Sequence, residues 1–340
     1  MSNRKDDHIH SALDQHHPHN DFDHIRFVPE ALCQLDCKDI DTSVAVFGHV
    51  FDYPVYINAM SGGSNLSKEV NDKLSKIAKS CNLPMATGSV SAAIKDPSWT
   101  ESFSIVRDNH PEGFVFANVG LSQTKEGAQK AIDILNANAL QIHLNAAQEI
   151  TMPEGDREFS HWKQRLKDIM DYVSVPVMVK EVGFGMSKET IDELYELGVE
   201  TVDVSGKGGT NFIQIENERR QNKLNHFDAH GFSTVESLLD AKLRRSKDAI
   251  VFASGGIRGA YDIVKALALG ASMVGLSGYF LKLVQNHTLD EAISHTQTLL
   301  SDIKNIMAVL NAQTIEALRK KPLLLSRDLI HFMNQRKNSI

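Results

Sequence analysis

Two glycine-containing turns in the last third of the chain are suited to hold a phosphate group. An apolar run ends in residues 254–258 (SGGIR), and a second run ends in residues 275–278 (GLSG). Glycine lets the backbone approach an anion closely, and the amide groups that open a following helix point at it. A single Gly-Gly pair after a strand is an ordinary turn. Two such turns in succession predict a phosphorylated cofactor or substrate.

Lys180 is a candidate for charge stabilisation because it interrupts the apolar run Val177–Val179. Its ammonium group must emerge at the end of the strand or pair with an acid inside. A cation there can stabilise a developing anion, including the charge at N1 of a reduced flavin, or it can form a Schiff base. Because Lys180 lies within an apolar run, we do not expect a surface lysine whose aliphatic stem packs along the protein while its ammonium group stays in water.

A third candidate site is the segment 143–149, which contains His143, Asn145, Gln148 and Glu149. One carboxylate cannot surround a magnesium ion by itself. Glu149 instead fits a Mg²⁺ whose other ligands are water and a substrate diphosphate. Taken alone, a single glutamate on a loop is ordinarily a solvated side chain.

The N-terminal run Arg4-Lys5-Asp6-Asp7-His8 offers a possible anion-binding set. The planar fork of Arg4 suits phosphate oxygens, and Lys5 and His8 could complete the set. From residue chemistry alone, a disordered charged tail is the better interpretation.

Apolar runs separated by amphipathic segments predict parallel strands alternating with helices. Several runs are continuously apolar, as expected of strands that are covered on both faces. Periodicity predicts helices over Lys68–Cys81, Lys125–Leu135 and Lys188–Leu197, the last capped by Ser187. The eight expected strands are Val55–Met60, Pro84–Thr87, Phe114–Val119, Ala139–Leu144, Pro176–Val182, Thr201–Val204, Ala249–Ala253 and Met273–Leu276.

Eight strand–helix units favour a (β/α)₈ TIM barrel in the α/β class, as a single domain over residues 1–340. Residues 1–54 form an extension, in which Val44–Phe47 and Val50–Tyr53 predict a hairpin that plugs the bottom of the barrel. The connection 206–232 after the sixth strand is long enough to be a lid. Residues 290–318 are expected to be helical cover, and the tail after Arg327 is expected to be partly loose.

In such barrels the active residues lie at the carboxyl ends of the strands. Nearly every expected strand here ends in a polar or ionisable residue, commonly followed by glycine. Polar groups at these positions cost desolvation energy unless they are paired. The pattern as a whole therefore predicts a functional barrel mouth more strongly than any single residue does.

Composition excludes several other classes of protein. The chain has 42% hydrophobic and 23% charged residues, a net charge of −7 and no basic stripe, so nucleic acid is not an expected partner. No run of 18 apolar residues predicts a membrane span. Cys33, Cys37 and Cys81 are too few and too scattered for a disulfide framework or a zinc site. We expect a soluble cytoplasmic protein.

These motifs, in order from residue 3 to about residue 285, resemble the type 2 isopentenyl-diphosphate Δ-isomerases, which are FMN-dependent TIM barrels. The N-terminal RKDxH and the HLNxxQE segment at 143–149 separate this family from other FMN barrels. The resemblance implies that residues at seven of the eight strand ends contact FMN. This implied set comprises Ala59, Met60, Ser61, Ser89, Asn118, Lys180, Ser205, Thr210, Gly255, Gly256, Ile257, Arg258, Ser277 and Gly278.

The resemblance also implies a substrate site. Arg4, Lys5 and His8 would bind the diphosphate, which reverses the interpretation of that tail. Gln148 would contact the substrate, and Glu149 would hold Mg²⁺. His143, Asn145 and Lys180 would complete the catalytic set with Gln148. Many relatives carry an arginine where this chain has Ser91, which leaves that diphosphate contact open, with Lys95 as a candidate substitute.

The implied reaction moves a double bond between isopentenyl and dimethylallyl diphosphate, with no net redox change. Protonating an alkene requires a water-poor, electron-rich pocket that stabilises a tertiary carbocation-like state. We expect reduced FMN, through N5, to act as acid and base, with NADPH as its reductant. The resemblance further implies a homo-oligomer, either a tetramer or an octamer.

Two rival functions share the fold. An FMN-dependent 2-hydroxy acid oxidase or dehydrogenase needs a His–Asp pair and arginines at the late strand ends, and the seventh strand end offers only Arg258. The second rival is a flavin- or phosphate-binding barrel without catalytic activity. The presence of Gln148, Glu149 and Lys180 together argues against it.

Overall fold

The computed structural model describes residues 6, 9–11, 13, 15, 20–60 and 62–338. Eight parallel strands close into a barrel in the order β10-β11-β4-β5-β6-β7-β8-β9, so each strand neighbours the next along the chain. The expected (β/α)₈ TIM barrel is confirmed. The barrel strands are β4 (Val55–Ile57), β5 (Met85–Ala86), β6 (Val115–Gly120), β7 (Ala139–His143), β8 (Val177–Lys180), β9 (Thr201–Asp203), β10 (Ile250–Ser254) and β11 (Val274–Leu276).

All eight predicted strands are present, although most are shorter than their apolar runs. The ladder closes where Val274 of β11 pairs with Val55 of β4 and Ala253 of β10 pairs with Val274. The residues beyond the paired segments turn into the loops of the barrel mouth, which is why the polar strand ends gather there.

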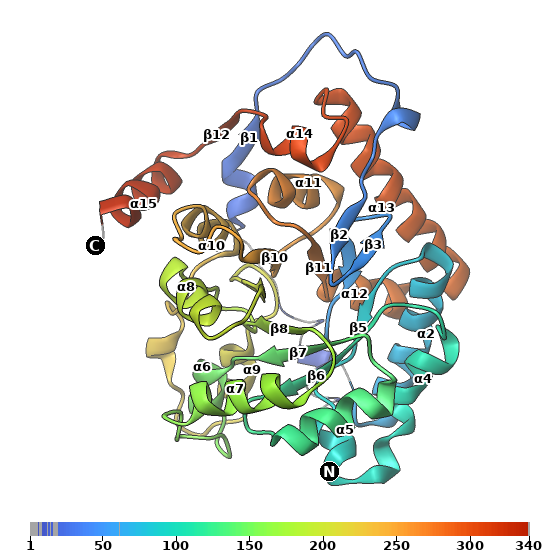
Figure 1. The fold of residues 1–340 in the computed structure, drawn as a ribbon, viewed down its shortest axis with the longest axis vertical. Helices are drawn as coiled ribbons and strands as arrows, with labels where there is room; N and C mark the ends of the chain where they lie inside the picture. Colours follow the sequence, from blue (N-terminus) through green and yellow to red (C-terminus); the bar gives the residue numbers. More distant parts are fainter. Residues whose placement is uncertain are drawn as a thin grey trace.

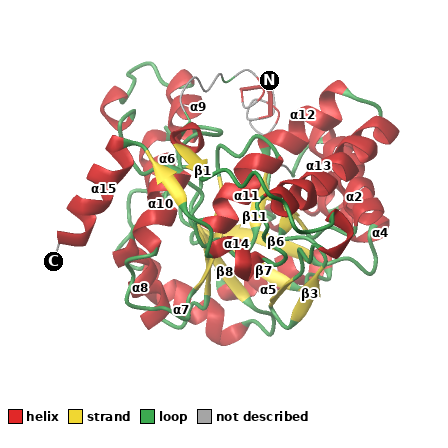
Figure 2. Cartoon of the chain, turned by 90° about the horizontal axis from the view of Figure 1, so that it is seen from above, coloured by secondary structure: helices red, strands yellow, loops and turns green. Residues whose placement is uncertain are grey.

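Helices surround the strands in both views (Figures 1 and 2). The predicted helices are confirmed to within a few residues, and Ser187 caps its helix by accepting a hydrogen bond from the amide of Thr190. The helices are α2 (Asn65–Cys81), α3 (Ser91–Lys95), α4 (Glu101–Asn109), α5 (Lys125–Leu135), α6 (Ala146–Thr151), α7 (Trp162–Tyr172), α8 (Lys188–Glu196), α9 (Phe212–Glu218), α10 (Thr234–Ala241), α11 (Ala260–Ala268), α12 (Gly278–Asn286), α13 (Leu289–Val309), α14 (Ile315–Arg319) and α15 (Arg327–Asn338).

The predicted hairpin consists of β2 (Val44–Val46) and β3 (His49–Phe51) and closes the amino end of the barrel. Its turn residue Phe47 places its ring centroid 5.8 Å from that of Phe116 and 5.9 Å from that of Phe252, both of which point into the barrel. The hairpin, with Val46 and Phe51, thus shares one apolar cluster with the barrel interior. The expected plug is confirmed.

Side chains inside the barrel form an apolar layer below a polar one. Tyr56, Phe116 and Phe252 belong to the lower layer, and two residues further along each strand lie Asn58, Asn118 and Ser254. Alternation along a strand puts both members of each such pair on the same face. The polar layer therefore faces the barrel mouth.

Two segments far apart in the sequence pair in a small sheet that the sequence analysis did not predict. Strand β1 (Ile25–Phe27) pairs antiparallel with β12 (Leu323–Leu325). Beyond it, α15 lies at the edge of the molecule in both views (Figures 1 and 2). Arg336 of α15 donates to the buried carboxylate of Asp240 in α10. The expectation of a loose tail after Arg327 was wrong, because this ion pair fixes the final helix.

The connection 206–232 is not a structureless loop. It contains α9 and a short 3₁₀ helix, Asn225–Phe227. Two mutual hydrogen bonds join Gln15 of the N-terminal extension to the backbone of Asn211, at the start of α9. The amphipathic α9 packs against α6, with Ile213 and Phe184 in one small apolar cluster.

Candidate active site

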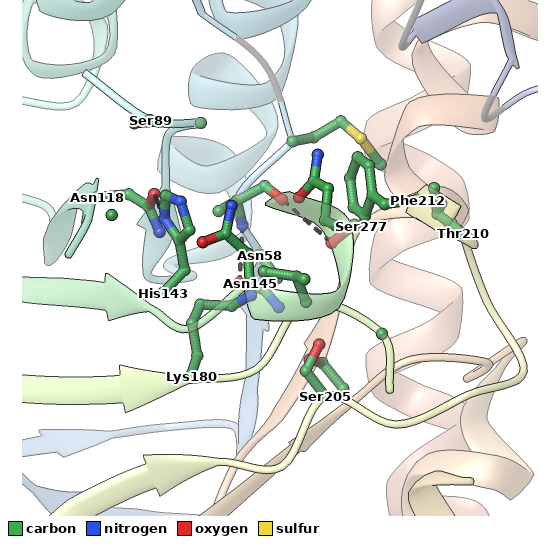
Figure 3. Close-up of a pocket in the computed structure, with 18 of the residues that line it drawn as sticks. Asn58, Ser89, Asn118, His143, Asn145, Lys180, Ser205, Thr210, Phe212 and Ser277 are labelled. Atoms are coloured by element: carbon green, nitrogen blue, oxygen red, sulfur yellow. Dashed lines mark hydrogen bonds between the residues drawn. The ribbon is translucent and has the colours of Figure 1, made fainter. Parts of the chain in front are cut away.

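The carboxyl ends of all eight barrel strands open into one cavity of about 1000 Å³. Figure 3 shows side chains from several strands converging on it, among them Asn58, His143 and Lys180. Every predicted site residue that the structure describes lies on its wall. These residues are Ala59, Met60, Ser89, Asn118, His143, Asn145, Gln148, Glu149, Lys180, Ser205, Thr210, Gly255, Gly256, Ile257, Arg258, Ser277 and Gly278.

Arg4, Lys5, His8 and Ser61 lie outside the described residues. Ser91 and Lys95, the residues left open at the diphosphate position, both line the cavity. The Ser91 hydroxyl accepts hydrogen bonds from Ser89 Oγ and from Gln123 Nε2, each at 3.0 Å. Ser91 therefore holds Ser89 in place, whereas the exposed Lys95 lies on the rim.

The two glycine turns form one wall of the cavity, and α12 begins there. In the part of the chain that the structure describes, an added Cβ at Gly278 would meet no atom within 4 Å, and this residue lines the cavity. The first amide groups of a helix have no acceptor within the helix. The amides at the start of α12 are thus available to an anion in the cavity, as the phosphate interpretation requires.

The neighbouring turn is held from outside the barrel. Thr234 Oγ1 donates to the carbonyls of Ser254 and Gly255, and Asn20 Nδ2 donates to Gly256 O. The guanidinium of Arg258 forms ion pairs with Asp23 and Asp262, whose carboxylates raise its pKa. The Arg258 side chain is therefore already paired, so the turn offers an anion mainly its backbone.

Lys180 is buried, with 6% of its surface exposed, and its Nζ donates to the carbonyl of Glu181 at 2.7 Å. Burial lowers the pKa of this lysine, and the carboxylates of Asp203 and Glu181 oppose that shift. Burial raises the pKa of the Glu181 carboxyl group to about 7, although amides of residues 182–184 donate to it. Lys180 thus places a largely buried amino group at the cavity wall.

Asp203 at the end of β9 is the polar centre of the barrel and is fully buried. It accepts hydrogen bonds from Tyr56 Oη (2.6 Å), Ser254 Oγ (2.7 Å) and the amide of Ser205 (3.0 Å). Ser205 itself has a left-handed backbone, with φ of 35°, which L-residues rarely adopt. The Asp203 carboxylate stabilises this strained residue at the cavity wall.

Glu149 is held on both oxygens. Oε1 accepts from Asn145 Nδ2 and Oε2 accepts from the amide of Asp156, each at 2.8 Å. Its carboxylate is therefore fixed at the cavity wall and can share a lone pair with a metal ion. Among the described residues, no three histidine, cysteine or acidic side chains are grouped closely enough to hold a metal by themselves.

Glu216 is a site residue that the sequence analysis missed. It lies on α9 with none of its surface exposed, and its Oε1 accepts from Gln148 Nε2 at 3.3 Å. Arg219, one turn along, pairs with Glu216 and with Glu154. The sequence showed a charge run there, but the apolar Ile213 and Ile215 were a signal that this helix is half buried.

Comparison with known proteins shows the family and the fold to which this chain is similar. The chain matches the FMN-dependent dehydrogenase family over residues 7–99 and 108–325. A flavocytochrome b2 variant with sulfite bound has a similar fold, with a TM-score of 0.70 and 20% sequence identity over 99% of this chain and 85% of that one. The chain therefore belongs to the FMN-dependent dehydrogenase family, and its barrel has the fold of that family.

Relatives that match over nearly their whole length identify the family more specifically. The chain is 46% identical to the isopentenyl-diphosphate delta-isomerase of Latilactobacillus sakei, over 100% of this chain and 98% of that protein. It is 44% identical to the enzyme of the same name from Staphylococcus epidermidis, over 98% of this chain and 96% of that protein. The chain therefore belongs to the isopentenyl-diphosphate delta-isomerase family.

Proposed function

We propose that the chain interconverts isopentenyl and dimethylallyl diphosphate, with FMN bound in the cavity and Mg²⁺ on the diphosphate. The observation that carries the proposal is the identity of 44–46% to isomerases of this name over essentially the whole chain. Two features of the cavity support it: a paired set of phosphate-binding turns and a separately oriented carboxylate, Glu149.

The cavity fits FMN by its chemistry. Its volume of about 1000 Å³ is at the upper end of the range for ligand pockets, which suits a cofactor and a substrate together. Gly278 and the turn at 255–257 would hold the phosphate, and Lys180 would face the ring. Reduced FMN, when bound, supplies an electron-rich surface and an exchangeable proton.

The residues of the chain hold the substrate against that surface. Glu149, fixed by Asn145 and by the amide of Asp156, would hold Mg²⁺ on the diphosphate and keep it from leaving as an allylic leaving group. Arg4, Lys5 and His8 would bind the same group, and Lys95 would substitute for the arginine that many relatives carry at the position of Ser91. The buried Gln148 would lie beside the hydrocarbon end.

The double-bond shift adds a proton at the terminal methylene carbon and removes one from the carbon on the other side of the tertiary centre. The carbocation-like state between the two steps survives only where water is excluded. Phe212, Val182 and Met152 supply an apolar part of the cavity wall. The proposed catalytic set of His143, Asn145, Gln148 and Lys180 lines the same cavity.

Further parts of the proposal concern the setting of the enzyme. We propose NADPH as the reductant of FMN, a cytoplasmic location, and a homo-oligomer that is either a tetramer or an octamer. Among the described helices, none combines the length and the apolar character that a membrane span needs.

The test is an anaerobic incubation of the purified chain with FMN, NADPH, Mg²⁺ and isopentenyl diphosphate, with dimethylallyl diphosphate followed by NMR. We expect many turnovers for each NADPH consumed, and none when the flavin stays oxidised. In ²H₂O, deuterium should enter the new methyl group. FMN binding without any product would contradict the proposal.

A further inference from the structure

A line of buried hydrogen bonds crosses the barrel from Asp203 to His143, beneath the cavity. Asn58 Nδ2 donates to Asp203 Oδ2 at 3.3 Å, and Gln141 Nε2 donates to Asn58 Oδ1 at 3.5 Å. Asn118 Nδ2 donates to Gln141 Oε1 at 3.1 Å, and Asn118 Oδ1 lies 2.9 Å from His143 Nδ1. Figure 3 shows the Asn118 and His143 ends of this line side by side.

The direction of the line is fixed at its Asp203 end. An ionised carboxylate can accept hydrogen bonds but cannot donate them. Asn58 must therefore turn its NH₂ group, rather than its oxygen, toward Asp203. A second contact requires the same orientation, because the amide of Ala59 can only donate and it lies 2.7 Å from Asn58 Oδ1. Asn58 therefore presents its oxygen to Gln141.

Each later amide inherits its orientation from the one before. Gln141 must donate to the Asn58 oxygen, which turns its own oxygen toward Asn118. Asn118 must donate to that oxygen, which turns its own oxygen toward His143. Asn58, Gln141 and Asn118 are at most 3% exposed, so water does not compete for these groups. A flip of any one amide would place two donors or two acceptors in contact inside the barrel, which leaves buried polar groups without a hydrogen bond and is unfavourable.

We infer that this line sets the tautomer of His143, with the hydrogen of the neutral ring on Nδ1 and the lone pair on Nε2. Asp203 and Gln141 are thereby positioning residues for a histidine on the cavity wall, although neither belongs to the predicted site. His143 can accept a proton or a hydrogen bond at Nε2. It can donate from Nε2 only after the ring has taken up a proton.

The register of the barrel explains why the line reaches His143. Asn118 of β6 lies opposite Gln141 of β7, and Gly120 lies opposite His143 two residues further along both strands. A Cβ at Gly120 would lie 2.7 Å from His143 Nε2, so glycine leaves the ring the room to turn toward Asn118. The pairing register of β6 with β7 thus also fixes the orientation of the His143 imidazole ring.

The tautomer can be measured without any assay of activity. Solid-state ¹⁵N NMR of the FMN-loaded protein, labelled at histidine, resolves protonated from unprotonated ring nitrogens, and His143→Gln identifies the signals by their loss. At a pH where the ring is neutral, we expect His143 Nδ1 in the protonated range and Nε2 in the unprotonated range. The reverse assignment would overturn the inference.

A variant tests whether the line is the cause. Gln141→Met keeps the length of the side chain but removes both hydrogen-bonding groups, so Asn118 becomes free to flip. We expect a mixture of the two tautomers and a kcat that falls about tenfold, the effect of one hydrogen bond, with KM changed much less. A folded Gln141→Met protein with an unchanged tautomer would also overturn the inference.

Thr87→Val is the matched control. Thr87 is likewise buried next to a strand end of the barrel, but its Oγ1 has no hydrogen-bond partner among the described residues, and Thr87 does not line the cavity. We expect the wild-type tautomer in this variant. Only the effect on kcat rests on the proposed function. A chain with the Nδ1–H tautomer and no turnover would refute the proposed function but support the inference about His143. An active enzyme with the Nε2–H tautomer would support the proposed function but refute the inference about His143.

Discussion

The side-chain amide of Gln148 donates to the carboxylate of Glu216 across 3.3 Å, and so joins α6 to α9 inside the structure. One residue lies in the predicted catalytic set and the other on the connection after the sixth barrel strand. Through this contact the connection supports a side chain on the cavity wall.

The first prediction concerns Glu216. Glu216→Gln removes the charge that pairs with Arg219 and lets the residue at 216 present an NH₂ group to Gln148. We expect kcat to fall by about 10- to 100-fold, as is typical for residues that orient a catalytic group, with FMN still bound. Glu218→Gln, an exposed neighbour on the same helix, should keep wild-type turnover. Equal losses in the two variants would contradict the role of the buried contact.

The second prediction concerns the metal. Glu149→Gln retains a side-chain oxygen for Asn145 or Asp156 but loses the negative charge that a hard cation requires. We expect the Mg²⁺ concentration that gives half-maximal turnover to rise by about 10- to 100-fold. The matched control is Asp156→Asn, because the Asp156 carboxylate accepts hydrogen bonds from the neighbouring amides of Arg157 and Glu158, and the backbone amide that bonds to Glu149 is retained. An unchanged Mg²⁺ dependence in Glu149→Gln would remove Glu149 as the ligand.

A third prediction concerns the barrel interior. A Cβ at Gly275 would lie 2.5 Å from Cζ of Tyr56, whose hydroxyl is bonded to Asp203. Gly275→Ala should therefore displace the Tyr56 ring and lower the free energy of unfolding by about 1–3 kcal/mol. Chemical denaturation measures this loss. Gly259→Ala, where a Cβ meets no atom within 4 Å and φ is 177°, should be close to neutral.

The fourth prediction is a pH dependence of stability. Burial raises the pKa of Asp192, but hydrogen bonds from Ser246 and Arg245 outweigh it, so the pKa falls to about 2 from an ordinary 3.8. A carboxyl group with a lowered pKa stabilises the fold above its unfolded-state pKa, and this contribution is lost as the pH falls through the folded value.

Asp192→Asn should therefore lower the free energy of unfolding by about 2 kcal/mol at neutral pH. The difference from the wild type should shrink between about pH 4 and pH 2. Glu196→Gln on the same helix is the control, because its pair with Arg245 is exposed and such pairs contribute little. A difference that persists unchanged at pH 2 would contradict the assignment.

The strands were predictable because each is a continuous apolar run, and the polar residues that follow them marked the mouth. Val177–Val179 followed by Lys180 is the clearest case. In a parallel barrel, sequence order and spatial order coincide, so each strand end could be placed in the site without knowledge of distant contacts.

What escaped prediction depends on contacts between distant parts of the chain. Strand β12 has three residues and exists only because β1 lies beside it. Glu216 was not predicted, because its burial depends on how α9 packs against α6. Gln141 was hidden within an apolar run, where one amide gave no sign that Asn58 and Asn118 lie on either side of it.

The pairing of β1 with β12 also has a consequence for the order of synthesis. The segment that brings Asp23 to Arg258 runs directly into β1, and β1 finds its partner strand only when Leu323–Leu325 has left the ribosome. A nascent chain that ends before that point contains all eight barrel strands but lacks the strand that anchors this segment beside the phosphate turn. The ion pair of Asp23 with Arg258 therefore gains the support of a paired β1 only after Leu323–Leu325 has been synthesised.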